Sequence, residues 1–391
     1  MGESVDVVIA GGAAVGSATA YYLKKHGFKG SVLVLERDLG FAECSTTRSL
    51  GGIRQLFSTE ENILLSQFGM RLLRNLKEEF GSEADVSYRE QGYLILASEQ
   101  GEPILRQTAA LQNSMGASTL VLDPPALEAR FPWLSPQGIA AGAFGSKGDG
   151  WVDPWSLMSL FRKGAETKGV EWRQGVVNAL GIEGGKVHSV GLADGSEISC
   201  GAFVNAAGPG GGAIAAMAGI EHPVGPRKRY IYVLDCREAD EALHRAPLTI
   251  NPQGVYMRPE GRSFLAGLAP EEHEEPEATG YDVDFTWFEE RIWPALAELI
   301  PVFEAVKVVN SWVGYYDHNA FDHNAVIGPH PEIGNFYFNN GFSGHGLQQS
   351  PAAGNAVAEL IVHGEYREID LKRFGYERFR DGQPLREINV V

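Results

Sequence analysis

A glycine-rich turn between two short apolar segments, at the start of the chain, constrains the fold more than any other feature. Residues 5–10 and 31–35 are predicted to be buried strands, and a helix to about His26 follows the turn. The turn reads Gly11, Gly12, Ala13, Ala14, Val15, Gly16. A dinucleotide-binding turn has glycine at its first, third and sixth positions, so Ala13 makes the match imperfect.

Glu36 ends the second predicted strand, where a carboxylate would accept hydrogen bonds from ribose hydroxyls. The N-terminus of the helix after the turn would supply N–H groups and a favourable dipole for a diphosphate. A plain structural turn that packs a helix on a sheet is the alternative, and it leaves Glu36 unexplained. The combination predicts a nucleotide cofactor.

Composition and charge exclude several classes of protein. The 391 residues correspond to roughly two or three domains. The net charge of −17 argues against nucleic acid and anionic membranes as partners. The three cysteines are scattered and the histidines lack metal-ligand spacing, so we expect a reducing compartment and no metal. The uncharged stretch 202–220 contains Asn205 and Pro209, so we expect no membrane span. No targeting segment is predicted before the first strand, so we expect a cytoplasmic protein.

The remaining pattern predicts an α/β fold. The predicted helices cover residues 60–80, 105–115, 154–168 and 285–299, and a last one ends near residue 363. Residues 170–200 read as a β-meander, and further strands are predicted at 93–97, 227–234, 255–258 and 336–338. We expect a discontinuous dinucleotide-binding domain with a mostly parallel sheet (1–85, 150–222 and 310–391). A smaller substrate domain with an antiparallel sheet would take 86–149 and 223–309.

Two later segments distinguish between cofactors. Residues 203–208 form a buried strand that ends in small residues, and residues 341–346 are rich in glycine and lead into a helix. The N-terminus of that helix would stabilise negative charge on a reduced flavin. An NAD-dependent dehydrogenase is a weaker alternative, because a single dinucleotide fold does not explain residues 341–350.

Seven motifs together resemble one family, the FAD-dependent amino-acid oxidoreductases of the D-amino-acid oxidase/sarcosine oxidase group. They are GGAAVG (11–16), LVLE (33–36), STTRSLGGIR (45–54), FVNAAG (203–208), YMRPEG (256–261), GYYD (314–317) and GFSGHG (341–346). Within the group, the chain looks most like the branch of the mitochondrial FAD-dependent oxidoreductase-domain protein implicated in complex I assembly. Without a predicted transit peptide, it looks like a bacterial relative of that branch.

The resemblance implies a set of cofactor contacts. Beyond the turn at residues 11–16 and Glu36, it places FAD against Arg37, Ser45, Thr46, Arg48, Ser49, Gly51, Gly52, Val177, Ala206, Ala207, Gly208, Gly314, Gly341, Phe342, Ser343, Gly344, His345, Gly346, Leu347 and Gln348. Sarcosine oxidases tether flavin through a cysteine in the region that here reads residues 312–316, without cysteine. We therefore expect non-covalent FAD.

An amino-acid substrate needs a guanidinium for its carboxylate, because the net charge of the protein repels anions. Arg258 is the first candidate; the alternative is that it is a surface residue that pairs with Glu260. Arg54 is the second candidate; the alternative is that it braces the cofactor loop. His345, between two glycines, is a further candidate, with a helix-capping role as its alternative. The other candidates are Tyr256, Tyr315 and Gln348, the last standing where sarcosine oxidase uses a lysine. The basic run at residues 227–229 is interpreted as a solvated face, outside the site.

The resemblance implies oxidation of a C–N bond in a small amino acid, most of all a secondary, sarcosine-like one. Hydride would pass to flavin N5 and the imine would hydrolyse in water. The lysine that the oxidases of this family use with oxygen is missing from residues 262–267, so we expect a slow reaction with oxygen. Two electron acceptors remain open: oxygen, and a quinone or electron-transfer protein. The alternatives are a D-amino-acid oxidase or dehydrogenase, and a flavin-stabilised assembly protein with little turnover.

Overall fold

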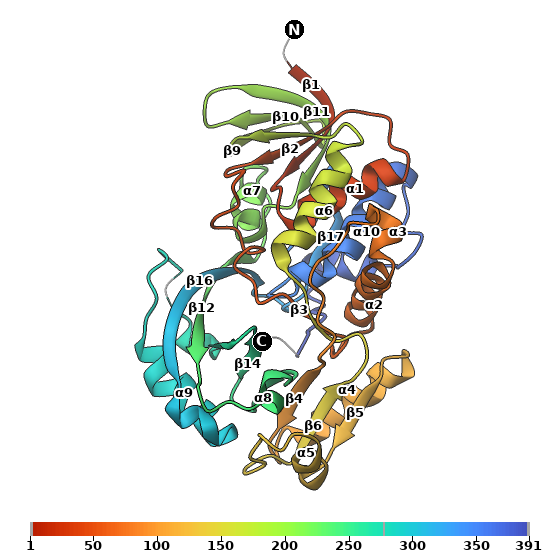
Figure 1. Ribbon diagram of the computed structural model, residues 1–391. Helices are drawn as coiled ribbons and strands as arrows, with labels where there is room; N and C mark the ends of the chain where they lie inside the picture. Colours follow the sequence, from red (N-terminus) through yellow and green to blue (C-terminus); the bar gives the residue numbers. More distant parts are fainter. Residues whose placement is uncertain (1–2, 277, 389–391) are drawn as a thin grey trace.

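Two eight-stranded sheets organise the chain in the computed structural model, which describes residues 3–276 and 278–388 (Figure 1). In the first sheet, β1 (Glu3–Ala10) lies between β2 (Val32–Glu36) and β11 (Glu197–Asn205) and is parallel to both. The sheet continues through β8 (Glu171–Gln174) beside β2, and through β18 (Phe336–Asn340) and the antiparallel edge strand β17 (Val326–Pro329) beside β11.

Both faces of this sheet are covered, which explains the continuous apolar runs in its central strands. On one face lie α1 (Ala14–Lys25), α2 (Glu60–Arg74), α6 (Pro154–Glu166) and α10 (Gly346–His363), and Figure 1 shows α1, α6 and α10 beside the sheet. The predicted meander, β9 (Val177–Glu183) and β10 (Lys186–Leu192) leading into β11, lies with α7 (Gly211–Ala216) on the other. Val7 and Ile9 therefore pack in one core and Val8 in the other.

The second sheet is antiparallel apart from one parallel pair, β13 with β4. Its strands in spatial order are β16 (Lys307–Asn319), β12 (Val224–Asp235), β15 (Ser263–Leu268), β14 (Val255–Glu260), β13 (Leu248–Ile250), β4 (Tyr93–Ala97), β6 (Ala141–Gly145) and β5 (Thr119–Leu122). Its helices are α4 (Glu102–Ser114), α5 (Pro124–Arg130), α8 (Glu241–His244) and α9 (Trp293–Leu299). A short ribbon, β3 (Gly52–Ile53) with β7 (Gly150–Trp151), accompanies the two sheets.

The mixed α/β architecture is as predicted, with local differences. The helix expected at 60–80 is interrupted at Asn75, and its second part is α3 (Leu76–Phe80). Asparagine is a poor residue for a helix interior, because its side chain competes for backbone hydrogen bonds. The helix expected at 285–299 contains a π-helical turn, Phe288–Ile292, before α9, whose first turn holds Pro294 and thus lacks one N–H.

The strands of the first sheet come from residues 3–36, 171–205 and 326–340, and those of the antiparallel sheet come from residues 93–145 and 224–319. Residues 310–319, which the domain prediction assigns to the FAD domain, pair with β12 in the antiparallel sheet. The exact boundaries stay a prediction. In the part of the chain that the structure describes, no helix is long and apolar enough to cross a membrane.

Candidate active site

A cavity of about 650 Å³ runs between the two sheets, within the usual size range of ligand sites. It begins at the carboxyl end of β1 and of β2, which is where open α/β sheets bind ligands. From there it passes the segment 43–54 and the end of β11, and it reaches β12, β14, β16 and the start of α10. It therefore connects the predicted cofactor motifs with the predicted substrate sheet.

The glycine-rich turn approaches its neighbours too closely for side chains at two positions. Gly11 has φ +97°, and a Cβ there would lie 2.3 Å from the carbonyl oxygen of Ala206. A Cβ on Gly16 would lie 1.9 Å from the carbonyl oxygen of Gly11. Gly11, Ala13 and Val15 line the cavity, and the other three members of the turn, Gly12, Ala14 and Gly16, lie outside its lining.

Glu36 is buried at the cavity wall and its carboxylate is fixed by the backbone. Oε2 accepts a hydrogen bond from the Gly12 N–H at 2.8 Å, and Oε1 accepts one from the Asp38 N–H at 3.1 Å. Arg37 and Val177 line the same end of the cavity. A carboxylate held in this way is positioned to accept further hydrogen bonds from a ligand hydroxyl.

The segment after β2 supplies an unused polar atom. Ser45 Oγ is buried at the cavity wall, with no hydrogen-bond partner among residues 3–276 and 278–388. Its neighbour Thr46 accepts the N–H of Ala14 at 3.3 Å, and Arg48 donates to the carbonyls of Ala42 and Val313. Thr46, Arg48, Ser49 and Gly52 line the cavity, but Gly51 does not.

The glycine-rich turn before α10 is held by one buried carboxylate. Asp317 accepts the N–H groups of Gly341 at 2.8 Å and Phe342 at 3.1 Å. Burial raises the pKa of Asp317 to about 6, against these two hydrogen bonds. The residues of this region that line the cavity are Phe342, Gly344, His345, Gly346, Leu347 and Gln348, whereas Gly341 and Ser343 lie outside the lining.

The end of β11 and the middle of β16 complete the cofactor side. Ala206, Ala207, Gly208 and Gly314 all line the cavity. With the close approach at Gly11 and the unpartnered Ser45 hydroxyl, they form an elongated surface of small residues and backbone. This surface fits the FAD that the sequence motifs imply.

Arg54 contacts two other predicted site residues at the cavity wall, His345 and Gln348. It is only 3% exposed, and its guanidinium donates to the carbonyl of Leu56 at 2.7 Å. Its Nη2 lies 3.3 Å from His345 Nε2. Gln348 accepts the backbone N–H of Arg54 at 2.7 Å, which ties the segment 43–54 to α10.

Tyrosines of the antiparallel sheet also line the cavity. Tyr256 and Tyr315 line the cavity as predicted sites, and burial raises the pKa of Tyr256 well above its ordinary value. The Tyr315 hydroxyl donates to the carbonyl of Gly280. Tyr93 and Tyr316 also line the cavity, although the sequence did not single them out. Their positions depend on strand pairing, which the sequence alone does not reveal.

The structure does not bring Arg258, the first carboxylate candidate, to the cavity. It lies on the same face of β14 as Tyr256 but two residues further along, beneath the cofactor loop. Its guanidinium donates to the carbonyls of Leu50 and Pro259 at 2.9 Å each and pairs with Glu260. It also lies over the Trp151 ring, 5.1 Å from the centroid. Arg258 braces the loop that carries Arg54 and lies outside the lining of the cavity.

Arg229, which the sequence interpretation left on a solvated face, lines the cavity and is 4% exposed. Its guanidinium lies 4.9 Å from the centroid of the Tyr316 ring and forms a two-point ion pair with Glu275 at 2.7 and 2.8 Å. The signal that was overlooked is strand alternation: Ile231, two residues on, shares this face and lines the cavity as well.

Comparison with known proteins gives a consistent assignment. The family model described as FAD dependent oxidoreductase matches residues 6–360. FAD-dependent oxidoreductase domain-containing protein 1 of Xenopus laevis is 39% identical over 427 residues, which cover 100% of this chain and 85% of that protein. Dimethylglycine dehydrogenase of Rattus norvegicus is 26% identical, over 95% of this chain and 45% of that protein.

A solved structure has the same fold over its full length. L-proline dehydrogenase from P. horikoshii superposes with a TM-score of 0.86 and 27% identity, covering 98% of this chain and 100% of that one. The resemblance carried by the motifs at 11–16, 203–208 and 341–346 is thereby confirmed. The chain belongs to the family of FAD-dependent oxidoreductases.

Proposed function

We propose that the protein oxidises the C–N bond of a small amino acid, with secondary amino acids of the sarcosine type as the leading class. The observation that carries the proposal is Arg54, a buried guanidinium at the wall of the cavity that the FAD motifs also line. A protein with a net charge of −17 needs such a local cation to bind a carboxylate. The dimethylglycine and L-proline dehydrogenases similar to this chain act, by their names, on secondary or tertiary amino acids.

Each residue has a defined task in this proposal. Arg54 binds the substrate carboxylate, His345 orients the guanidinium, and Gln348 fixes the backbone beneath it. Tyr256 stays protonated because burial raises its pKa, so it serves as a wall and not as a base. Bound FAD would supply the acceptor for the hydride that leaves the substrate carbon. The amine enters neutral, loses its remaining proton to water as the imine forms, and the imine is hydrolysed.

FAD is proposed to bind without a covalent link. Residues 312–316 hold no cysteine, and Cys44 is the cysteine that lines the cavity. Burial raises the pKa of the Cys44 thiol, with two weaker hydrogen bonds from Thr47 in the opposite direction. A thiol kept protonated is a poor nucleophile.

The electron acceptor is proposed to be a quinone or an electron-transfer protein, with oxygen reacting slowly. A positive charge beside the flavin accelerates oxygen reduction by stabilising superoxide as it forms. The strand β15 (Ser263–Leu268) carries no lysine or arginine. Of the two arginines at the cavity wall, Arg229 is paired with Glu275, and Arg54 would be paired with the substrate carboxylate. Stopped-flow reoxidation of the reduced protein tests this point, and a rate constant with oxygen far above that of free reduced flavin would contradict it.

The alternative, a flavin-stabilised assembly protein with little turnover, predicts a cavity filled by side chains. The buried guanidinium of Arg54 at the cavity wall favours turnover instead, because a protein that only holds FAD needs no anchor for a carboxylate.

The experiment is the anaerobic reduction of the bound flavin by N-methylglycine in wild type and Arg54→Lys. Lysine keeps the charge but loses the two-point geometry. We expect kcat/KM to fall about 30- to 1000-fold, which corresponds to a loss of about 2–4 kcal/mol in carboxylate binding. Dimethylamine, which lacks the carboxylate, should react poorly and equally with both proteins.

The matched control is Arg291→Lys, because Arg291 is exposed on the surface and forms its ion pair with Glu274 outside the cavity. Equal reduction of wild type and Arg54→Lys by N-methylglycine would remove Arg54 from the proposal.

A further inference from the structure

Arg229 has a donor that the folded chain leaves unused. Its Nη1 and Nη2 atoms hold Glu275, and Nη1 also donates to the carbonyl of Lys228. Its Nε is buried without a hydrogen-bond partner in the described part of the chain. A buried N–H left without an acceptor is costly. The guanidinium therefore has an open donor while it lies at the wall of the active-site cavity.

The charges around Glu275 are unbalanced. Arg229 pairs with it directly, and Arg227 Nε lies 3.9 Å from its Oε1. The Nε of Arg227 is likewise buried and has no hydrogen-bond partner among the described residues. Two guanidinium groups thus share one carboxylate, so this cluster of three side chains carries one positive charge in excess.

Arg229 and Arg54 act on the same tyrosine. Burial raises the pKa of Tyr316, and the positive charges of Arg229 and Arg54 both act in the opposite direction. Tyr316 lines the cavity together with both arginines. The cavity wall thus carries two buried cations, with Tyr316 within the field of each.

We propose that Arg229 is a second carboxylate anchor, and that the preferred substrates are secondary amino acids that carry a second carboxylate. Glu275 occupies this anchor in the resting protein. The second carboxylate of the substrate displaces it and binds the guanidinium through two of its N–H groups. The inference rests on the proposed function, in which Arg54 takes the first carboxylate.

The substrate proposed here differs from a sarcosine-like amino acid only at its far end. A monocarboxylate meets Arg54 and leaves Glu275 in place, whereas a dicarboxylate also exchanges with Glu275. A two-point guanidinium–carboxylate contact in a buried site adds both strength and geometric selectivity. Specificity would then follow from the second contact.

Isothermal titration calorimetry of the FAD-loaded protein tests this with two ligands that have an ether oxygen in place of the amine. Methoxyacetate carries one carboxylate and diglycolate carries two, and neither can form an imine. Wild type should bind diglycolate at least about tenfold more tightly than methoxyacetate. Glu275→Gln, which removes the competing charge, should tighten diglycolate about tenfold further and leave methoxyacetate unchanged.

Arg229→Gln should abolish the preference for diglycolate while methoxyacetate still binds. Glu274→Gln is the matched control, since Glu274 forms a comparable two-point pair with Arg291 outside the cavity. It should leave both affinities unchanged. If Arg229→Gln does not fold, the Glu275→Gln comparison carries the test alone.

Equal binding of the two ligands in wild type and in Glu275→Gln would overturn the proposal. So would an equal loss of both ligands in Arg229→Gln, because Arg229 would then serve the first carboxylate. Neither ligand can be oxidised, so this result is independent of turnover. If diglycolate is preferred but no amino acid reduces the flavin, the anchor stands and the proposed reaction fails.

Discussion

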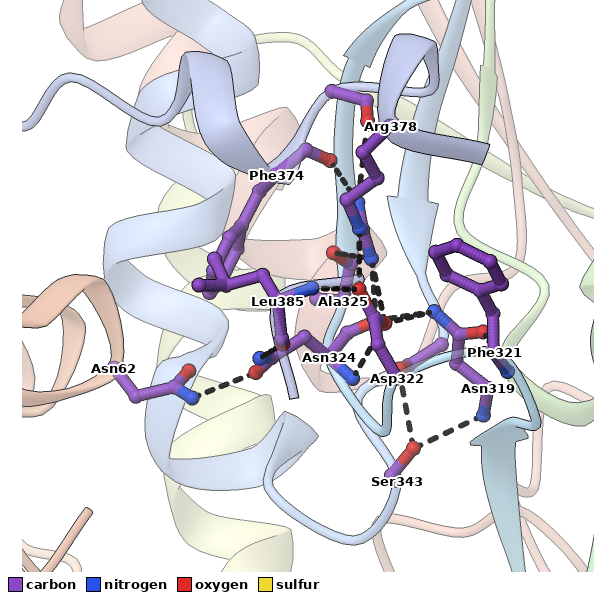
Figure 2. Close-up of polar contacts among 12 residues, drawn as sticks. Asn62, Asn319, Phe321, Asp322, Asn324, Ala325, Ser343, Phe374, Arg378 and Leu385 are labelled. Atoms are coloured by element: carbon purple, nitrogen blue, oxygen red, sulfur yellow. Dashed lines mark hydrogen bonds and ion pairs between the residues drawn. The ribbon is translucent and has the colours of Figure 1, made fainter. Parts of the chain in front are cut away.

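Replacement of Asp322 by asparagine should destabilise the protein more than any substitution on its surface. Asp322 is fully buried and pairs with Arg378 through two contacts, Oδ2 with Nε at 2.7 Å and Oδ1 with Nη2 at 3.1 Å. Figure 2 shows Asp322 between Arg378 and Asn319. Arg378 also donates to the carbonyls of Phe374 and Ala325, so its guanidinium is held on every side.

The cost follows from the hydrogen-bond partners of the two oxygens. Oδ2 also accepts the N–H of Leu385 at 3.0 Å, and Oδ1 accepts from Asn319 Nδ2 at 3.0 Å and from the N–H of Asn324 at 3.2 Å. The amide group of an asparagine would meet donors at either position, and the Arg378 charge would stay buried without a counter-ion. Breaking a buried pair in this way costs about 3–5 kcal/mol.

The turn that carries His345 should be affected as well. Asn319 is held by Asp322, and its backbone N–H donates to the hydroxyl of Ser343 at 3.0 Å. Ser343 has a positive φ of 50°, which a serine rarely adopts without such support. We expect Asp322→Asn to weaken FAD binding along with stability.

Urea unfolding monitored by tryptophan fluorescence measures the free energy. Glu368→Gln is the control, because Glu368 pairs with Arg71 on the surface with side chains 45% and 53% exposed. Such a pair contributes about 0–1 kcal/mol. A loss below 1 kcal/mol for Asp322→Asn would refute the reasoning.

The remaining predictions concern the cofactor turn, a buried acid and the flavin linkage. Gly16→Ala places a Cβ 1.9 Å from the Gly11 carbonyl oxygen, so fluorescence titration should show FAD binding at least about tenfold weaker; unchanged affinity would contradict the close approach. Burial raises the pKa of Asp149 to about 7, and hydrogen bonds from Gln55 act in the opposite direction. The folded protein therefore holds a proton on Asp149 that the unfolded chain releases. The stability that this proton contributes is complete below about pH 4 and is lost as the pH rises to about 7. Urea unfolding at pH 5 and pH 8 measures this loss, and Asp149→Asn should make the difference in unfolding free energy between the two pH values smaller. The same difference in wild type and variant would contradict the prediction. Acid precipitation should release all FAD into the supernatant from wild type and Cys44→Ser alike; flavin retained only by wild type would reveal a link to Cys44.

The cofactor half of the site was predictable from the sequence because its signals are local. A strand, a turn, a helix and an acid occur within the first 36 residues, and each is fixed by neighbours in the chain. Gly11 and Gly16 are required by contacts with the turn itself and with the end of β11. Small residues at such close approaches leave a recognisable pattern.

The substrate half was less predictable because it depends on where strands end relative to the cavity. Arg258 and Arg229 both stand on strands of the antiparallel sheet and both are buried. Sequence alone favoured Arg258, yet its position beneath Leu50 keeps it from the cavity. Arg229 looked solvated within a basic run, and the pairing of β12 with β16 buries it beside Tyr316.

Anaerobic reduction of the bound flavin by a panel of amino acids tests the central claim most directly. The panel should include N-alkyl, imino and primary amino acids, together with amines that lack a carboxylate. We predict bleaching of the flavin by secondary amino acids, with one carbonyl product and one amine function released per flavin reduced. A flavin that dithionite bleaches but that no member of the panel reduces would contradict the account.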